Sequence, residues 1–331
     1  GTRIPEFKNE NVRIVKTKYP SKLFGYVLQN IFAWPKLDRL LDVDVFFMPH
    51  INFFAFSSEV KTIVTVHDLS FLLYPEFFSF KKNIWHKMLN VNSNLKKFDQ
   101  VIAISKNTKQ DLIDQCGVDE NKIKLIHSGI SNNFKKIDIN NSRLYKVREK
   151  YKLPNDFILY LGTIEPRKNV DGLIAAYEKL IEENPELKHL ELVIAGARGW
   201  KYQKTIISWK GSKYFDKIKF ISYVDEEDKV YLYNLAKIFV YPSFYEGFGF
   251  PPLEAMACGT PVVASANSSL TETLGNAAIL INPYNVNSIK QAVKELLQDK
   301  DYEKELIRRG YINVVKYNWR QTAKQFLQLT K

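Results

Sequence analysis

The second half of the chain alternates short apolar runs with helical patterns, and this alternation restricts the fold more than any other feature. The apolar runs predict strands at 157–162, 190–196, 217–222, 238–243, 261–265 and 277–281. Helices are predicted between and after them, at 169–184, 226–235, 252–258, 286–298, 301–309 and 318–330. Apolar strands that are linked by helices indicate a parallel sheet covered on both faces.

The first half of the chain repeats this pattern less regularly. Strands are predicted at 12–15, 44–48, 62–66, 100–104 and 122–126, and helices at 21–33, 83–97 and 106–116. Ser105 and Asn107 are candidate caps for the last of these helices. The polar segment 131–156 lacks apolar periodicity and is predicted to link two domains. We therefore expect an α/β protein with two Rossmann-like domains that face a cleft, where strand ends collect ligands.

The positive charge of the chain, a net +12, is concentrated in its first half. Residues 1–150 carry 24 Lys and Arg against 15 Asp and Glu, whereas residues 151–331 carry 24 against 21. This excess favours an anionic partner, which could be a phosphate-bearing substrate, an anionic membrane face or nucleic acid. An ordinary solvated basic surface is the alternative. No apolar run reaches the 18 residues that would predict a membrane-spanning helix.

Cysteines and acidic pairs give no sign of a disulfide framework or a metal site. The chain has two cysteines, Cys116 and Cys258, and so low a cysteine content fits a reducing compartment. We interpret Cys258 as a core residue. Asp42 and Asp44 have the Asp-x-Asp form of some metal-dependent transferases. They lie where a helical stretch meets an apolar strand, so we interpret them as structural.

The segment "FYEGFGFPPLEAMACGTPVVAS" (244–265) places two glutamates around glycines and prolines. Glu246 follows a predicted strand and should lie in a loop at the carboxyl edge of the sheet. The prolines suit a first helical turn, so a helix should start near Pro251 and carry Glu254 in that turn. The glycines allow a close backbone approach, and a helix start favours anions and hydroxyls. Two carboxylates at one site therefore predict binding of vicinal hydroxyls, as in a sugar or a ribose.

With these features the chain looks like a retaining glycosyltransferase of family 4, which has the GT-B architecture. Its "EGFGFPPLE" (246–254) matches the E-x7-E motif of that family. Other segments resemble the family's phosphate-binding, acceptor-side and shorter motifs: "YLGTIEPRKNVDGLIAAY" (160–177), "VHDLSFLLYPEFFS" (66–79), "AISKNTKQDL" (103–112) and "LIHSGI" (125–130). The resemblance covers nearly the whole chain and comes closest to mannosyltransferases of bacterial surface-polysaccharide assembly.

The resemblance implies a role for each residue that matches a family motif. The catalytic residues that it implies are His67, Glu246, Arg167 and Lys168. The donor-binding residues that it implies are Gly162, Thr163, Arg167, Lys168, Glu246, Gly247, Phe248, Gly249 and Glu254. Asp68 and Tyr74 are implied on the acceptor side. The family retains the anomeric configuration, and the resemblance implies no metal and no cofactor.

The implied roles follow the chemistry of glycosyl transfer. Arg167 and Lys168 would stabilise the charge that grows on the departing diphosphate. Glu246 would hold hydroxyls of the donor sugar, and Glu254 would hold the ribose. His67 would contact the donor sugar and diphosphate from the other domain; adjacent side chains on a strand point to opposite faces, which argues against a His67–Asp68 dyad.

The resemblance also implies a domain division and two departures from the family pattern. The division is 1–135 for the acceptor-side domain, 136–155 for a linker, 156–315 for the nucleotide-sugar domain, and 316–331 for a helix that packs back toward the first domain. Relatives begin with a strand and a Gly-rich turn, and we expect that this segment is missing here. Many relatives carry Arg at the position of Thr163; either Arg167 compensates or the phosphate grip is weaker.

The aromatic stretch "FLLYPEFFSF" (71–80) is followed by Lys81, Lys82 and Lys87. One interpretation is a hydrophobic plug on the first domain. The other is a docking surface for a lipid-linked acceptor at an anionic membrane, to which each lysine contributes about 1 kcal/mol.

The expected activity is transfer of a hexose, most specifically mannose from GDP-mannose, to a hydroxyl of a growing polysaccharide or lipid-linked saccharide. A UDP-sugar-dependent transferase and a non-catalytic sugar-nucleotide-binding protein are the alternatives. A nucleic-acid partner is not expected, because the second half shows no stripe of lysines interleaved with aromatic residues. The expected location is the cytoplasm, with peripheral contact at the inner face of the plasma membrane.

Overall fold

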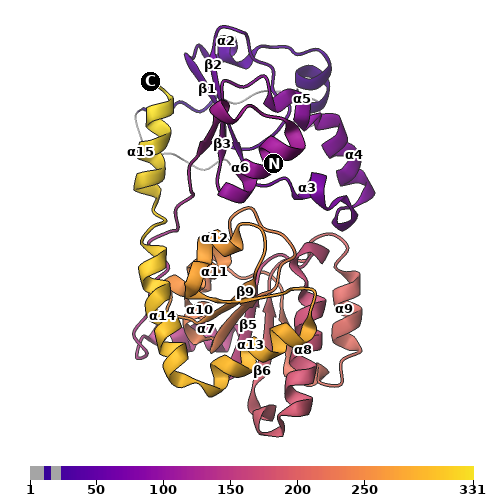
Figure 1. Cartoon of the computed structure of the whole chain (residues 1–331), viewed down its shortest axis with the longest axis vertical. Helices are drawn as coiled ribbons and strands as arrows, with labels where there is room; N and C mark the ends of the chain where they lie inside the picture. The colour runs from indigo at the N-terminus through magenta and orange to yellow at the C-terminus, as the bar shows by residue number, and fades with distance from the viewer. Residues whose placement is uncertain (1–10, 16–23) are drawn as a thin grey trace.

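The computed structural model describes residues 11–15 and 24–331, which form two α/β domains stacked along the long axis of the molecule (Figure 1). The prediction of a strand at 12–15 is wrong. These residues are exposed and lie outside any strand, because no strand among the described residues pairs with them. The other predicted strands are present, and the two parallel sheets that they form confirm the expected α/β class with two Rossmann-like domains.

The first domain contains a four-stranded parallel sheet in the order β1-β2-β3-β4. Its strands are β1 (Val45–Met48), β2 (Lys61–Val66), β3 (Gln100–Ala103) and β4 (Ile123–Leu125). Its helices are the π-helix η1 (Phe24–Ile31), α2 (Leu37–Leu41), α3 (Ser70–Leu73), α4 (Phe80–Leu89), α5 (Val91–Leu95) and α6 (Lys106–Cys116). The helix predicted at 83–97 is divided at Asn90, whose φ of 42° ends α4. Ser105 caps α6, because its side chain accepts from the N–H of Thr108.

The second domain contains a six-stranded parallel sheet in the order β10-β9-β8-β5-β6-β7. Its strands are β5 (Phe157–Leu161), β6 (Glu191–Ala195), β7 (Ile218–Ile221), β8 (Ile238–Tyr241), β9 (Val262–Ser265) and β10 (Ile279–Ile281). The chain builds outward from β5 to β7 and then returns to place β8 on the other side of β5. The order of the strands therefore reverses between β5 and β8, and in such sheets the crevice at the reversal point binds ligands.

Helices cover both faces of this second sheet, as right-handed crossovers in opposite directions require. Its helices are α7 (Ser142–Tyr151), α8 (Val170–Glu183), α9 (Gln203–Lys210), α10 (Lys229–Leu235), α11 (Phe250–Ala257), α12 (Leu270–Leu274), α13 (Val286–Gln298) and α14 (Lys300–Val314). Helix α8 packs against α9 and α13, whereas α10 packs against α7 and α11. The core is continuous, and every side chain of β5 is buried within it.

The segment predicted as a polar linker contains helix α7. Leu144 and Val147 are buried on its inner face. On its polar side Lys150 Nζ lies 2.5 Å from the buried carboxylate of Asp228, which also accepts from Tyr151 at 3.0 Å. The few apolar residues of this segment suffice for a helix because an ion-pair network attaches it to α10.

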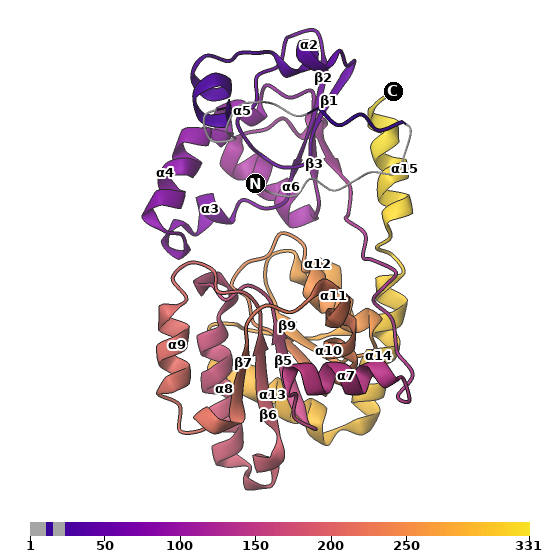
Figure 2. The same ribbon diagram turned by 180° about the vertical axis from the view of Figure 1, so that it is seen from behind.

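The last helix, α15 (Trp319–Leu329), lies against the first domain, whereas α14 belongs to the second (Figures 1 and 2). The ring centroids of Phe326 and Phe47 are 4.5 Å apart. Phe326 and Leu329 also pack on a small cluster around Ile63. The chain thus crosses between the domains a second time near Tyr317, whose carbonyl accepts from the N–H of Ile130.

The aromatic stretch 71–80 packs across the interdomain cleft. Phe78 stacks on Trp200 of the second domain with a centroid separation of 5.4 Å, and Phe77 stacks on Phe244 at 5.5 Å. The indole N–H of Trp200 donates to the carbonyl of Phe77 at 2.7 Å. The stretch is therefore not a plug confined to the first domain, because its rings join the two domains opposite α15.

Candidate active site

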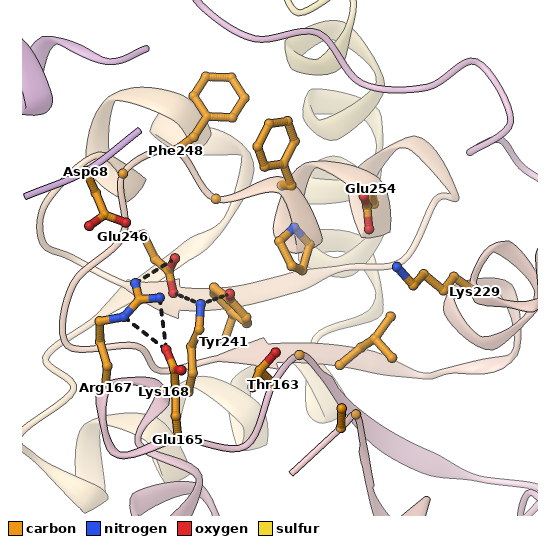
Figure 3. A pocket seen from close by; sticks show the side chains of 18 of the residues that line it. Asp68, Thr163, Glu165, Arg167, Lys168, Lys229, Tyr241, Glu246, Phe248 and Glu254 are labelled. Atoms are coloured by element: carbon orange, nitrogen blue, oxygen red, sulfur yellow. Dashed lines mark hydrogen bonds and ion pairs between the residues drawn. The ribbon is translucent and has the colours of Figure 1, made fainter. Parts of the chain in front are cut away.

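A cavity of 770 Å³ lies where the carboxyl ends of the two sheets face each other. The first domain contributes His67 and Asp68, which follow β2, and Ile104, which follows β3. The second domain contributes the loop after β5, the loop between β8 and α11, and the start of α10 (Figure 3). The reversal of strand order between β5 and β8 brings these two loops together. The structure thus places nearly all of the predicted site residues around one cavity.

Glu246 is the centre of a buried group of charges in this cavity. Its carboxylate lies 2.5 Å from Lys168 Nζ and 3.2 Å from Arg167 Nη1 (Figure 3). Burial alone would raise the pKa of this carboxyl, but the two cations outweigh it and lower the pKa to about 2. Glu246 is therefore ionised at neutral pH, although only 7% of its surface is exposed.

Arg167 and Lys168 are held by the protein itself. Arg167 donates to the carbonyl of Tyr245 at 2.6 Å and pairs with Glu165, whose Oε1 lies 3.0 Å from Nη2. Lys168 donates to the hydroxyl of Tyr241 at 2.7 Å. Arg167 has five N–H groups and Lys168 has three, so each of them keeps one N–H group without an acceptor among the residues that the structure describes.

Electrostatically, this group is balanced rather than basic. When all are ionised, the two cations face the two carboxylates of Glu165 and Glu246. Burial lowers the pKa of Lys168, while its pairing with Glu246 opposes this effect. Burial also raises the pKa of Glu165, against the attraction of Arg167. A diphosphate at this site would therefore receive directed N–H groups more than an excess of positive charge.

The loop after Glu246 requires glycine for two different reasons. A Cβ on Gly247 would lie 1.9 Å from the carbonyl oxygen of His67, so only glycine lets the two domains approach here. Gly249 has a φ of 97° and precedes α11. The N–H groups of residues 247–249 have no acceptor within the described part of the chain, and these three residues line the cavity at a helix start.

The prediction that Glu254 lies in the first turn of a helix is wrong by one turn. Helix α11 begins at Phe250, directly after Gly249, so Glu254 lies in its second turn. The side chain still lines the cavity, and it accepts from the hydroxyl of Tyr233 at 2.8 Å. Burial raises the pKa of Glu254, whereas the Tyr233 hydrogen bond and nearby Lys229 lower it.

His67 and Asp68 are the polar residues of the first domain that line the cavity. His67 Nε2 lies 2.9 Å from the carbonyl oxygen of Pro49, and Asp68 Oδ1 accepts from the N–H and hydroxyl of Ser70. Both residues lie beyond β2, which ends at Val66, so the alternation of side chains along a strand does not apply to them. Both residues line the cavity.

Of the remaining predicted residues, Gly162, Thr163 and Phe248 line the cavity but Tyr74 does not. Tyr74 stacks on Phe77 and lies 5.6 Å, centroid to centroid, from Tyr245. It therefore belongs to the aromatic contact between the domains.

Some cavity residues are absent from the sequence prediction. The polar and aromatic ones among them include Glu165, Trp200, Tyr223, Lys229, Tyr233 and Tyr241. The start of α10 after β7 is a position at which Lys229 could have been anticipated, because strand ends and helix starts meet there. Within the described residues, no cluster of acidic, His or Cys side chains could hold a metal, and Asp42 and Asp44 are exposed.

Two stacked Rossmann-like domains with such a cleft between them define the GT-B class. A family model described as "Glycosyl transferases group 1" matches residues 144–312, and "Glycosyltransferase Family 4" matches residues 2–134. The chain therefore belongs to the family 4 glycosyltransferases, as the sequence motifs predict.

Two curated relatives from Escherichia coli are mannosyltransferases by name. The serotype-specific mannosyltransferase WbdA is 32% identical over 274 residues, which are 80% of this chain but only 32% of WbdA. The O-antigen chain mannosyltransferase B is 31% identical over 85% of this chain and 72% of its own length. The chain thus spans about a third of the length of WbdA. Among solved structures, Anabaena HepE in complex with UDP and glucose superposes with a TM-score of 0.71 at 18% identity, covering 88% of this chain and 79% of HepE.

Proposed function

We propose that this protein transfers mannose from GDP-mannose to a hydroxyl group of a growing polysaccharide or lipid-linked saccharide, with retention of the anomeric configuration. The observation that carries the proposal is the buried contact of Glu246 with Lys168 and Arg167, in one cavity with Glu254. The mannosyltransferase names of relatives that match most of the chain support mannose as the sugar.

The donor would be held by the second domain. Glu254 would accept from the ribose hydroxyls, and Glu246 from hydroxyls of the mannose. The free N–H groups of Arg167 and Lys168, with the backbone amides of residues 247–249, would surround the diphosphate. Such fixed donors stabilise negative charge as it develops on the leaving group. His67 would contact the donor from the first domain.

In the transfer step the acceptor oxygen would form a bond to the anomeric carbon as the bond from that carbon to the diphosphate oxygen breaks. Attack from the same face retains the configuration. The departing phosphate oxygen would take the proton of the acceptor hydroxyl, so no metal and no cofactor is needed. Gly247 keeps the two domains close enough for the acceptor and the donor to meet.

Thermal stabilisation by GDP, UDP, ADP and their sugar conjugates tests the donor. A nucleotide at 100 times its Kd should add about 2.7 kcal/mol to the free energy of unfolding. Glu254→Gln should remove most of that effect, and Glu186→Gln, at an exposed position outside the cavity, is the control. Stabilisation by no nucleotide at all would refute the proposal.

A UDP-sugar is the second candidate donor. The structural similarity to HepE, which is solved with UDP and glucose, favours it. Stabilisation by UDP but not by GDP would select this alternative, and nucleotide binding without transfer to any saccharide would favour a non-catalytic binder.

The same proposal includes peripheral contact with an anionic membrane through α4. No helix in the described part of the chain combines the length and the apolar character that crossing a bilayer requires. On α4, Phe80 and Ile84 are 80% and 42% exposed, and Lys81 and Lys87 are exposed beside them. An apolar stripe flanked by lysines suits the surface of an anionic bilayer.

Sedimentation with phosphatidylserine vesicles at low and high salt tests this contact. Changing Lys81 and Lys87 to Glu should abolish salt-sensitive binding. The same changes at Lys188 and Lys210, exposed in the second domain, should not. Equal binding by both double variants would contradict the assignment to α4.

A further inference from the structure

A second, smaller cavity adjoins the donor cavity on the side of the first domain. Its volume is 160 Å³, and it lies between the end of β2 and helix α4. His67 and Asp68 line both cavities. A molecule seated in the smaller cavity would therefore meet the donor sugar at these two residues.

We propose that this smaller cavity binds one neutral hexopyranose residue of the acceptor. The inference rests on the glycosyl transfer proposed above and assigns the acceptor a place. The sequence predicts Asp68 and Tyr74 on the acceptor side. Asp68 lines the smaller cavity, whereas Tyr74 does not, and residues of α4 line it instead.

The walls of the cavity are apolar and aromatic. Phe71 and His86 stack with their centroids 4.3 Å apart, and Trp85 meets His86 edge-on at 5.1 Å. Ile51 closes another side. Flat aromatic faces match the C–H faces of a pyranose, and rigid rings that touch one another lose little freedom on binding.

Two polar atoms are available to the hydroxyl groups of such a sugar. Asp68 Oδ1 is used by Ser70, whereas Oδ2 has no hydrogen-bond partner among the described residues. His86 Nδ1 is buried without a partner. An N–H group at Nδ1 would have no acceptor, so the proton of the neutral ring belongs on Nε2, which a hydroxyl can reach.

The charge of the cavity favours a neutral sugar over an anionic one. Asp68 is the charged group that lines it, and the described lining includes no Lys or Arg. Burial and the nearby Lys82 lower the pKa of His86 to about 4, so the imidazole is neutral at pH 7. A phosphate or uronate in this cavity would meet the Asp68 carboxylate directly, whereas nearby Lys82 is not part of the lining.

The experiment measures binding directly, without the donor. Saturation-transfer NMR would compare methyl α-D-mannopyranoside with mannose 6-phosphate on the full chain. The neutral mannoside should bind and the phosphate should not. Trp85→Ala should raise the Kd about tenfold, as loss of an aromatic contact does.

His86 provides a matched pair of variants if Trp85→Ala fails to fold. His86→Leu removes the N–H group and should raise the Kd, whereas His86→Gln places an amide N–H near the Nε2 position and should restore binding. Trp209→Ala, which affects an aromatic cluster of the second domain, is the control and should not change the Kd.

The outcomes separate this inference from the proposed function. If GDP stabilises the protein but the mannoside Kd is the same in the His86→Leu and wild-type proteins, the subsite is refuted while donor binding stands. Preferential binding of mannose 6-phosphate would refute the neutral class of acceptor. Mannoside binding that depends on His86, without stabilisation by any nucleotide, would support the subsite and refute the donor proposal.

Discussion

Replacing Glu246 by Gln should destabilise the second domain more than almost any other single change in a polar residue. The carboxylate is buried, and its pKa lies near 2 instead of the usual 4.5 because Lys168 and Arg167 hold the ionised form. At 1.36 kcal/mol per pKa unit, this difference corresponds to about 3 kcal/mol of stability at neutral pH. The same magnitude is expected for leaving a buried charge without its partner.

The stability that Glu246 contributes should decrease as the pH falls. Because the folded-state pKa of Glu246 is depressed, its contribution is complete above pH 4.5 and is lost as the pH falls toward 2. Urea denaturation followed by circular dichroism should show a free energy of unfolding that falls over this range in the wild type. The Glu246→Gln variant should start lower at pH 7 and show less of that fall.

Glu305 provides the control, because its pKa is also lowered to about 2 but by Arg308 and Arg309 at a partly exposed position on the surface of α14. Solvent screens such pairs, so Glu305→Gln should leave the free energy of unfolding nearly unchanged. If Glu246→Gln behaved like Glu305→Gln, with no resolvable loss at pH 7, the buried ion pairs of Glu246 would not stabilise the fold and this prediction would be refuted.

Three further changes test how the domains meet and how the cavity is charged. Gly247→Ala would put a methyl group 1.9 Å from the carbonyl oxygen of His67 and would force the two domains apart locally. A shift of about 1 Å between donor and acceptor should lower kcat about 100-fold with little change in melting temperature. An unchanged kcat would exclude a role for this contact. Trp200→Ala should favour by about 2 kcal/mol an arrangement with the two domains further apart, because it removes a hydrogen bond to Phe77 and an aromatic stack on Phe78. Small-angle scattering without nucleotide should then show a larger radius of gyration. Thr163→Arg adds a cation to a balanced cavity and should lower the Kd for GDP about tenfold by calorimetry; an unchanged Kd would mean that this position does not face the phosphates.

The strands of the second domain could be predicted from the sequence because they lie in the interior of a parallel sheet. A central strand of a parallel sheet is buried on both faces, so a run such as Phe157–Leu161 has to be apolar throughout. Helix α7 could not be read in the same way, because contacts with distant Asp228 stabilise it as much as its own apolar residues do. Residues 12–15 have a strand-like sequence, yet no strand in the described part of the chain pairs with them.

The sequence by itself determined the two-domain α/β class, the positions of Arg167, Lys168 and Glu246 after strand ends, and the position of Glu254 on the helix that follows, because these depend on local periodicity, turn residues and a motif. Only the tertiary structure decided which groups meet. The ion pairs around Glu246 join residues nearly 80 positions apart, and the aromatic contact between the domains joins Phe78 to Trp200. The second cavity depends in the same way on the placing of α4 beside the end of β2. Such contacts are set by the order of strands and the approach of the domains, which no local pattern of residues encodes.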